Sequence, residues 1–374
     1  MGDKEDSLEP GEGRWHALSV YLLVLYGFYI MLSHFRLKGV FIHRICALWC
    51  IMMFMVVFFN SGGLLNNFKV FLWPLIFEMS YFSILSFPRR LTIIRNAYWI
   101  IFVWGAFLFL TSHGGYKGAV IPVLPNAVFT SLLTVPVLML MGNRKYQFFV
   151  LLLITLLVLI SMKRSSMLII AASWLAYILP VFKMNNKLLA TMLAGGIFLI
   201  GAVFFKQMNA AMGGGIEERI NREETDTGKN RLAIWGVTMT MIQQSSIKGY
   251  LVGHGHFGVK RDSILDISAH TDILEVIYDY GIITFVLYLG LWVYVLRRWW
   301  YLKKINSSLF FPYSISVAIF VFMSMVSHLI LYTAYFNFLV MFWGITEGMA
   351  TNRELSIEDK NENIICDKGL PIED

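Results

Sequence analysis

The chain contains a predominantly apolar stretch without charged residues at 146–160, YQFFVLLLITLLVLI. A helix of about 20 such residues crosses a hydrocarbon core about 30 Å thick. Comparable runs occur at 17–32, ALSVYLLVLYGFYIML, and at 45–59, ICALWCIMMFMVVFF. Of the 374 residues, 57% are hydrophobic and 15% are charged, whereas a soluble domain carries roughly 25% charged residues. We therefore predict an all-α polytopic membrane protein.

Apolar stretches of sufficient length predict eleven transmembrane helices. They fall at 15–34, 45–62, 70–87, 96–112, 118–141, 146–162, 165–182, 188–205, 280–297, 309–330 and 334–350. This assignment divides the chain into an N-terminal segment at 1–14, eight spans within 15–205, one large and partly helical loop at 206–279, three spans within 280–350 and a tail at 351–374. The tail is polar and charged, so we expect it to be solvated and disordered.

The distribution of Lys and Arg predicts the orientation, because short cytoplasmic loops retain positive charge. Among the short loops, one alternate set holds fourteen of these residues, and the other set holds four, which are Lys69, Lys117, Lys163 and Arg164; the long loop 206–279 is not counted, because the rule applies to short loops. The first set is therefore predicted to be cytoplasmic. The loop 206–279 and the N-terminal segment then lie outside the cell membrane, and the tail lies inside. The net charge of +7 follows from this topology, and no nucleic-acid-binding motif accompanies it.

The loop 206–279 has a helical part and a glycine-rich turn. Residues 230–245, NRLAIWGVTMTMIQQS, have helical periodicity, and residues 249–258 read GYLVGHGHFG. The turn matches the pattern GxGxxG, but no strand precedes it, so it does not predict a nucleotide site. His254 and His256 lack a nearby acid or cysteine, so we predict no metal site there.

The helical part places an arginine on an apolar face. At 100° per residue, Arg231 shares a face with Trp235, Thr238 and Ile242. In one interpretation the arginine extends from a membrane-surface helix toward water. In the other it points into a site between the loop and the bundle, where its planar fork can bind two phosphate oxygens at once.

The stretch SAHTDILEVIYDYGIIT at 268–284 predicts a short amphipathic helix. Ser268 or Thr271 can cap its start, and Gly281 is expected to loosen its junction with the next span. His270 falls on the apolar face, as a satisfied core residue or as a functional group. The opposite face carries three acids that we expect to be solvated, Asp272, Glu275 and Asp279.

A third group of polar residues, Lys163, Arg164, Ser165 and Ser166, stands at the start of the span predicted at 165–182. Two cations near a helix N-terminus suit an anion, and a phosphate in particular. The alternative is that they are ordinary loop cations, although they lie on the side that should be poor in positive charge.

The order of these features resembles the O-antigen polymerase and O-antigen ligase superfamily of bacterial membrane glycosyltransferases. A basic pair at a span start precedes a long external loop with an Arg-x-x-x-Trp helix, a GxGxxG-like turn and AHTDILEVIYDYGII. The likeness covers about 160–300 and is most specific over 249–283. The family motif typically reads Ala-His-Asn, two variable residues, Leu-Glu and then Gly-Ile-Ile-Gly. This sequence has Thr271 in place of the Asn and Thr284 in place of the second glycine. Ligase members tend to have twelve spans.

The resemblance implies a glycosyltransferase that acts on undecaprenyl-pyrophosphate-linked glycans at the outer face of the bacterial plasma (inner) membrane. An acceptor hydroxyl attacks the anomeric carbon, and the lipid pyrophosphate leaves. His270 would accept the hydroxyl proton, since the pKa of imidazole is ordinarily about 6.5. Arg231 would be catalytic as well, and with Arg164 and Lys163 it would stabilise the leaving pyrophosphate. No cofactor or metal is implied. Further candidates for substrate binding are Trp235, Glu275 and Ser165.

The sequence favours a polymerase over two alternatives. A polymerase uses lipid-linked oligosaccharide as both donor and acceptor, and a chain-length regulator in the bilayer is a candidate partner. A ligase would transfer the glycan to a lipopolysaccharide core instead. A flippase for the same lipid, the alternative from another class, would place its polar residues within the spans, whereas here they gather in one external loop.

Overall fold

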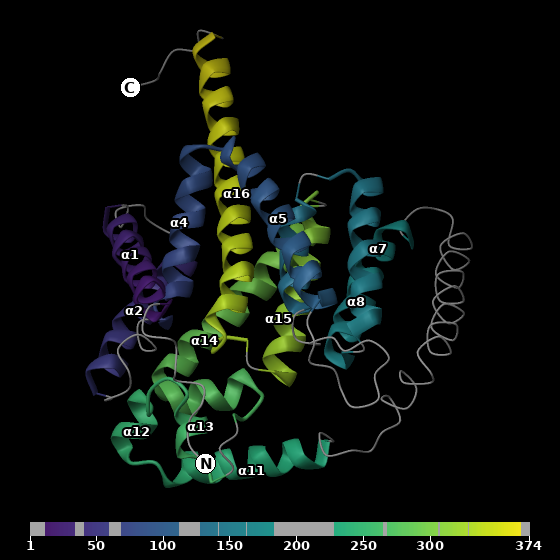
Figure 1. The fold of residues 1–374 in the computed structure, drawn as a ribbon. Helices are drawn as coiled ribbons and strands as arrows, with labels where there is room; N and C mark the ends of the chain where they lie inside the picture. The colour runs from purple at the N-terminus through teal and green to yellow at the C-terminus, as the bar shows by residue number, and fades with distance from the viewer. Residues whose placement is uncertain are drawn as a thin grey trace, which may run out of the picture.

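A computed structural model of the chain describes residues 12–33, 41–59, 69–111, 128–140, 142–161, 163–182, 228–264, 268–305, 307–327 and 329–367. Every regular element within these ranges is a helix, which confirms the predicted all-α class. Most of the helices stand side by side as a bundle, and the loop helices lie across one end of it (Figure 1).

The bundle helices follow the predicted spans. They are α1 (Glu12–Ser33), α2 (Phe41–Phe59), α4 (Leu72–Ser86), α5 (Arg90–Thr111), α6 (Val128–Leu138), α7 (Arg144–Ser161), α8 (Arg164–Phe182), α14 (Asp272–Lys304), α15 (Phe310–Val326) and α16 (Thr333–Asp367). Four of them, α2, α5, α7 and α14, are long and apolar enough to cross a membrane, and α1, α4, α6, α8 and α15 supply shorter apolar helices. The span predicted at 188–205 lies outside the described residues, so the count of eleven stays a prediction.

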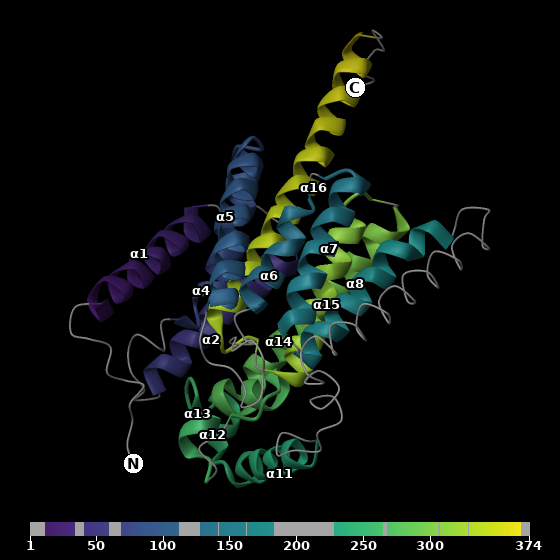
Figure 2. The ribbon, with the colours of Figure 1, turned by 45° about the vertical axis from the view of Figure 1, so that its right-hand side comes forward.

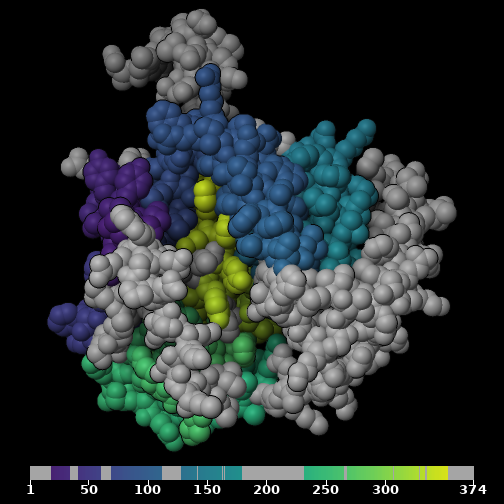
Figure 3. All heavy atoms as spheres, in the orientation of Figure 1, coloured from purple at the N-terminus to yellow at the C-terminus, as the bar shows by residue number. Residues whose placement is uncertain are grey.

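Three short helices of the loop form a layer at one end of the bundle. They are α11 (Gly228–Gln244), α12 (Ile247–Val252) and α13 (Gly258–Asp262). Figures 1 and 2 place this layer opposite the end from which α16 projects, and in Figure 3 its green atoms cover the lower edge of the visible face. The helix predicted at 230–245 is therefore confirmed as α11, whereas residues 206–227 of the loop lie outside the described residues.

The prediction of a disordered tail was wrong, because α16 continues as a helix to Asp367. The segment 351–367 contains neither glycine nor proline, so nothing in its backbone opposes the continuation of the span. The helix ends just before Gly369 and Pro371, which are residues typical of a helix stop.

Close packing between α4 and α16 depends on two glycines of α16. A Cβ atom on Gly344 would lie 2.5 Å from the Phe77 carbonyl oxygen, and one on Gly348 would lie 2.7 Å from the Tyr81 carbonyl oxygen. Small residues four apart let the backbones of two membrane helices approach in this way. The neighbouring Trp343 is fully buried and donates to the Ser316 hydroxyl of the next helix in the bundle, α15, at 3.1 Å.

Two charge pairs link neighbouring helices of the bundle. His43 Nδ1 of α2 lies 2.8 Å from Glu78 Oε1 of α4. At another position Arg298 Nε of α14 lies 3.1 Å from Glu347 Oε2 of α16, and the Tyr294 hydroxyl donates to the same oxygen at 3.0 Å. Such pairing is the usual condition for a charge within a membrane helix, and each pair ties two helices together.

The orientation can be tested with two exposed isoleucines at opposite ends of α14 and its loop. Ile264 is 95% exposed and Ile305 is 51% exposed. In a chain whose native cysteines are replaced by serine, we expect Ile264→Cys to react with a membrane-impermeant maleimide in intact cells with a permeabilised outer membrane. Ile305→Cys should react only after the cells are lysed. The reverse labelling pattern would contradict the predicted orientation.

The glycine contacts predict a loss of stability for Gly344→Ala. The added methyl group must displace the α4 backbone, and overpacking of this kind costs about 1–3 kcal/mol. We expect a lower unfolding temperature for the detergent-solubilised variant. Gly236→Ala on α11 is the matched control, since a Cβ there meets nothing within 4 Å and alanine favours a helix. Equal unfolding temperatures for the two variants would refute the role of Gly344.

Candidate active site

The inward face of α11 is the face predicted from the sequence. Thr238 and Ile242 are buried, and Arg231 and Trp235 are partly buried. On the other side Leu232 is 64% exposed and projects away from the protein. The prediction that Arg231 shares the protein-facing side with an indole is thus confirmed.

Trp235 joins α11 to the segment that carries His270. Its indole Nε1 donates a hydrogen bond to the Ala269 carbonyl oxygen at 2.9 Å. Arg231 lies one helical turn earlier on the same face, and a turn rises about 5.4 Å. The structure therefore brings Arg231 and His270 to the same part of α11, although they are far apart in sequence.

Arg231 has a buried guanidinium nitrogen. Its Nε is inaccessible to solvent and has no hydrogen-bond partner among the described residues. A buried donor without a partner is costly, at about 1–3 kcal/mol. An arginine in this condition is suited to bind an anion that arrives from outside the protein.

His270 does not lie on the helix that follows it, as the sequence had indicated. The helix begins at Asp272 with Thr271 at the N-cap position, but the Thr271 side chain makes no capping hydrogen bond and its hydroxyl donates instead to the Ser324 carbonyl oxygen at 3.4 Å. His270 stands before the cap with φ 56°, in the left-handed region that favours glycine. This conformation costs roughly 1–3 kcal/mol for a residue with a side chain and persists only where its surroundings impose it.

The three acids predicted to be solvated are buried. Asp272, Glu275 and Asp279 are each 0% exposed. The wet-face prediction fails because other segments cover the first turns of α14 and present backbone N–H groups to the carboxylates. A buried polar group is stable when it has such partners.

Each acid accepts from a different segment. Asp272 Oδ1 accepts from the Ile330 N–H at 3.1 Å, in the turn between α15 and α16. Glu275 Oε1 accepts from the His270 N–H at 3.1 Å. Asp279 Oδ1 accepts from the Val259 N–H at 2.9 Å, in the first turn of α13. The acids therefore fasten three segments to the start of α14.

The glycine turn docks on a break in α14 rather than on a ligand. Gly281, with φ 79°, interrupts the helix as predicted, and a Cβ there would lie 2.3 Å from the Leu251 carbonyl oxygen. The His254 N–H donates to the Tyr278 carbonyl oxygen at 3.0 Å, and the Gly255 N–H donates to that of Asp279 at 2.8 Å. The glycines thus allow two stretches of backbone to touch.

The two histidines of the turn are held by neighbouring aromatic residues. His254 stacks on Tyr278 with ring centroids 4.2 Å apart and an interplanar angle of 3°. His256 Nδ1 lies 2.6 Å from the Tyr280 hydroxyl. Burial, with a smaller contribution from the charge of Lys69, lowers the pKa of His256 to about 3, so this histidine is neutral near pH 7. In the described part of the chain no group of three or more His, Cys, Asp or Glu could hold a metal.

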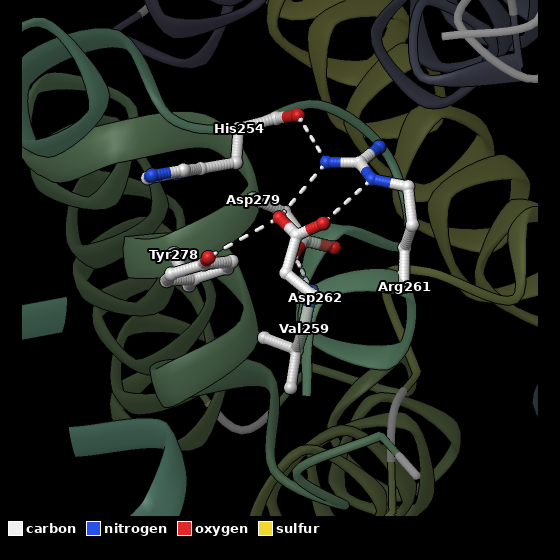
Figure 4. Close-up of polar contacts among 6 residues, drawn as sticks. All are labelled: His254, Val259, Arg261, Asp262, Tyr278 and Asp279. Atoms are coloured by element: carbon white, nitrogen blue, oxygen red, sulfur yellow. Dashed lines mark hydrogen bonds and ion pairs between the residues drawn. The ribbon is translucent and has the colours of Figure 1, made fainter. Parts of the chain in front are cut away.

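A polar network stabilises the turn next to these histidines (Figure 4). Arg261 Nε donates to Asp262 at 2.8 Å, and an Arg261 NH2 group donates to the His254 carbonyl oxygen at 2.9 Å. The Tyr278 hydroxyl donates to Asp262 at 3.2 Å. Burial raises the pKa of Asp262, but the hydrogen bonds and charge of Arg261 outweigh it and hold that pKa below its ordinary value. Unlike Arg231, this arginine is already satisfied by the protein.

The basic pair stands at the start of α8, at the same end of the bundle as α11 (Figures 1 and 2). The helix begins at Arg164, whose side chain lies outside the described part. Lys163 Nζ lies 4.5 Å from the centroid of the Phe129 ring. Ser165 is partly buried, and Ser166 is fully buried with a hydroxyl that has no partner among the described residues. Both serines lie inside the first turn of α8.

A chain of aromatic rings leads from Lys163 toward the glycine turn. Phe129 contacts Tyr335 with centroids 6.2 Å apart, Tyr335 stacks with Tyr332 at 6.0 Å, and Tyr332 meets Phe257 at 6.4 Å. The basic pair and the turn thus border a common region through the start of α16. Printed hydrogen bonds aside, the links are short: Trp235 donates to Ala269 and Glu275 accepts from His270, Arg231 lies one turn from Trp235 on α11, and the rings lead from Lys163 to Phe257 of the glycine turn.

Sequence reasoning overlooked Asp272 and Ser166 as contributors to this region. Asp272 was assigned to the solvated face, and Ser166 was considered only as one of the polar residues at the start of a span. The spacing of the acids at 272, 275 and 279 does indicate one shared helix face, but spacing alone does not reveal whether that face is covered.

Comparison with known protein families gives one match. Residues 149–289 match the family described as O-antigen ligase. The matched range runs from α7 through the loop helices into α14, and it includes every candidate site residue. No curated protein matches the chain. The match confirms the resemblance seen in the motifs of the loop.

Proposed function

We propose, from the match of residues 149–289 to the family described as O-antigen ligase and from the motifs of the loop, that the chain is a polysaccharide polymerase of the bacterial inner membrane. It would join repeat units of O-antigen, or of a related surface polysaccharide, that are carried on undecaprenyl pyrophosphate. The active site would lie on the periplasmic side, in the loop that contains α11 to α13. Donor and acceptor would both be lipid-linked glycans, and a chain-length regulator is a candidate partner in the bilayer.

The observation that carries the proposal is the meeting of Arg231 and His270 at one end of a membrane bundle. Trp235, one helical turn along α11 from Arg231, donates to the carbonyl oxygen of Ala269, the residue before His270. Arg231 offers a buried donor with no partner among the described residues, and His270 stands at a partly buried position in a strained backbone. An anion-binding group beside a proton acceptor suits a transfer in which an anion leaves and a hydroxyl attacks.

The reaction requires one bond to form and one to break. The acceptor hydroxyl oxygen bonds to the anomeric carbon of the donor glycan, and the bond from that carbon to the pyrophosphate oxygen breaks. His270 takes the hydroxyl proton. Arg231, with Arg164 and Lys163, stabilises the negative charge that develops on the leaving pyrophosphate. Charge stabilisation by these cations would make the reaction independent of a metal ion.

The other candidate residues support this arrangement in different ways. Ser165 lies in the first turn of α8, where backbone N–H groups favour an anion, and the buried hydroxyl of Ser166 stands beside it. Trp235 presents its indole N–H to the protein rather than to solvent, so we assign it to holding the His270 segment. The apolar surface near α11 would then meet the polyprenyl chain.

Two observations bear on the alternatives. The paired charges in the bundle, His43 with Glu78 and Arg298 with Glu347, are satisfied by each other and favour an enzyme over a flippase. The family description favours a ligase as much as a polymerase. Purified protein with lipid-linked repeat units alone distinguishes the two, because a polymerase makes a ladder of products and a ligase requires added lipopolysaccharide core.

We predict that His270→Ala abolishes glycan joining at equal amounts of purified enzyme. A positioned base contributes about 10²–10⁴-fold to the rate, while Arg231 still binds the donor. The measurement is the product ladder without added metal, beside a donor-binding assay. Ile264→Ala, at a fully exposed position of the same loop, is the control for handling of the protein. A full ladder from His270→Ala would remove the general base from the mechanism.

We also predict that Arg231→Lys strongly impairs activity, since lysine keeps the charge but loses the fork that binds two oxygens. A drop of about tenfold or more in kcat/KM for the donor is expected, which corresponds to about 1.4 kcal/mol or more. Lys260→Ala, an exposed cation on α13, is the matched control and should retain activity. If Arg231→Lys keeps full activity at normal protein levels, the arginine only extends from the surface toward water.

A further inference from the structure

The backbone of His270 is held from both sides by side chains of other segments. Glu275 Oε1 accepts from its N–H at 3.1 Å, and the same carboxylate accepts from the Ala269 N–H. On the opposite side, the Ala269 carbonyl oxygen accepts from Trp235. The peptide groups on either side of Ala269 therefore have fixed directions.

The Glu275 side chain extends from α14 back toward the preceding loop, where its carboxylate accepts from backbone N–H groups. The Glu275 N–H donates to the Thr271 carbonyl oxygen at 3.2 Å, as the first helical bond requires, while its side chain reaches back past the cap. Side chains that satisfy N–H groups at a helix start usually do so for residues of the helix itself. Here the satisfied groups belong to the two residues before the cap, and one of them has φ 56°.

The carboxylate is also enclosed. Glu275 is 0% exposed, whereas His270 is partly exposed. An acceptor hydroxyl can approach the imidazole from solvent but would have to displace protein to reach Glu275. His270 is therefore the residue that solvent can reach, and Glu275 is the enclosed residue that holds the His270 backbone.

We propose that Glu275 is a positioning residue whose oxygen fixes the left-handed backbone of His270, and that it neither binds substrate nor accepts the proton. The inference rests on the proposed function, in which His270 is the base. It accounts for a histidine at a position that would otherwise favour glycine. It also accounts for a buried acid five residues downstream of that histidine.

The test compares Glu275→Gln with Glu275→Met. Glutamine retains an acceptor oxygen at the same distance along the side chain, so we expect kcat within about tenfold of the natural enzyme. Methionine has a similar length but no acceptor, so the loop at 269–270 is released. A misplacement near 1 Å can cost about 10²-fold, and we expect a loss of that size in kcat with little change in KM for the donor. Asp262→Asn, an acid of the same loop held by Arg261, is the control and should keep its activity.

A double variant distinguishes this inference from failure of the proposed function. His270→Ala/Glu275→Met should be no less active than His270→Ala alone, because Glu275 acts only through His270. A further loss in the double variant would show an independent role for Glu275 and overturn the inference, as would an inactive Glu275→Gln or a fully active Glu275→Met. A fully active His270→Ala would instead overturn the proposed function.

A stability measurement provides a readout that does not depend on activity. Glycine adopts positive φ without strain, so His270→Gly removes the need to hold this backbone. Glu275→Met should therefore lower the unfolding temperature less in the His270→Gly background than in the natural chain. Equal decreases in the two backgrounds would mean that Glu275 serves general packing, and the inference would fail.

Discussion

Burial of three carboxylates at the start of α14 organises the end of the molecule that carries the loop helices α11 to α13. Asp272, Glu275 and Asp279 each need hydrogen-bond donors, because a buried acid without partners is strongly destabilising. Each finds them on a different segment, in the turn before α16, in the His270 loop and at α13. The covering segments bury the acids, and the acids in turn orient the segments. Neither arrangement is stable without the other.

The break at Gly281 makes this hub compatible with a membrane span. Its φ of 79° separates the first turns of α14 from the long apolar part, and the backbone at 251–255 fits into the gap. The GxGxxG pattern in the turn therefore has a physical meaning, which is close approach of backbone to something. The sequence could not say whether that partner was a phosphate or another part of the chain. The structure identifies it as the chain itself.

The spans and the inward face of α11 could be predicted because they depend on local properties. A run of apolar residues near the thickness of a bilayer identifies itself, and a helix of 3.6 residues per turn places Arg231 beside Trp235 whatever surrounds it. The burial of the acids could not be predicted in this way. Periodicity tells which residues share a face, but the cover over that face comes from Val259 and Ile330, at other points in the chain. The position of His270 was wrong for a related reason, since the helix starts two residues later and leaves the histidine in the loop.

The placement of charge divides the molecule into two working parts. Within the bundle, Arg298 forms an ion pair with Glu347. Charges paired in this way hold helices together and leave little net charge to attract a ligand. In the loop layer Arg261 forms an ion pair with Asp262. The buried Nε of Arg231, by contrast, has no hydrogen-bond partner among the described residues. A buried guanidinium nitrogen without a partner among the described residues, and a histidine in a left-handed backbone near the same helix, cost stability that the fold must recover from the buried contacts around them. Active sites commonly carry such a cost. It is this local imbalance, more than the pattern of spans, that locates the proposed chemistry at the contact between α11 and the start of α14.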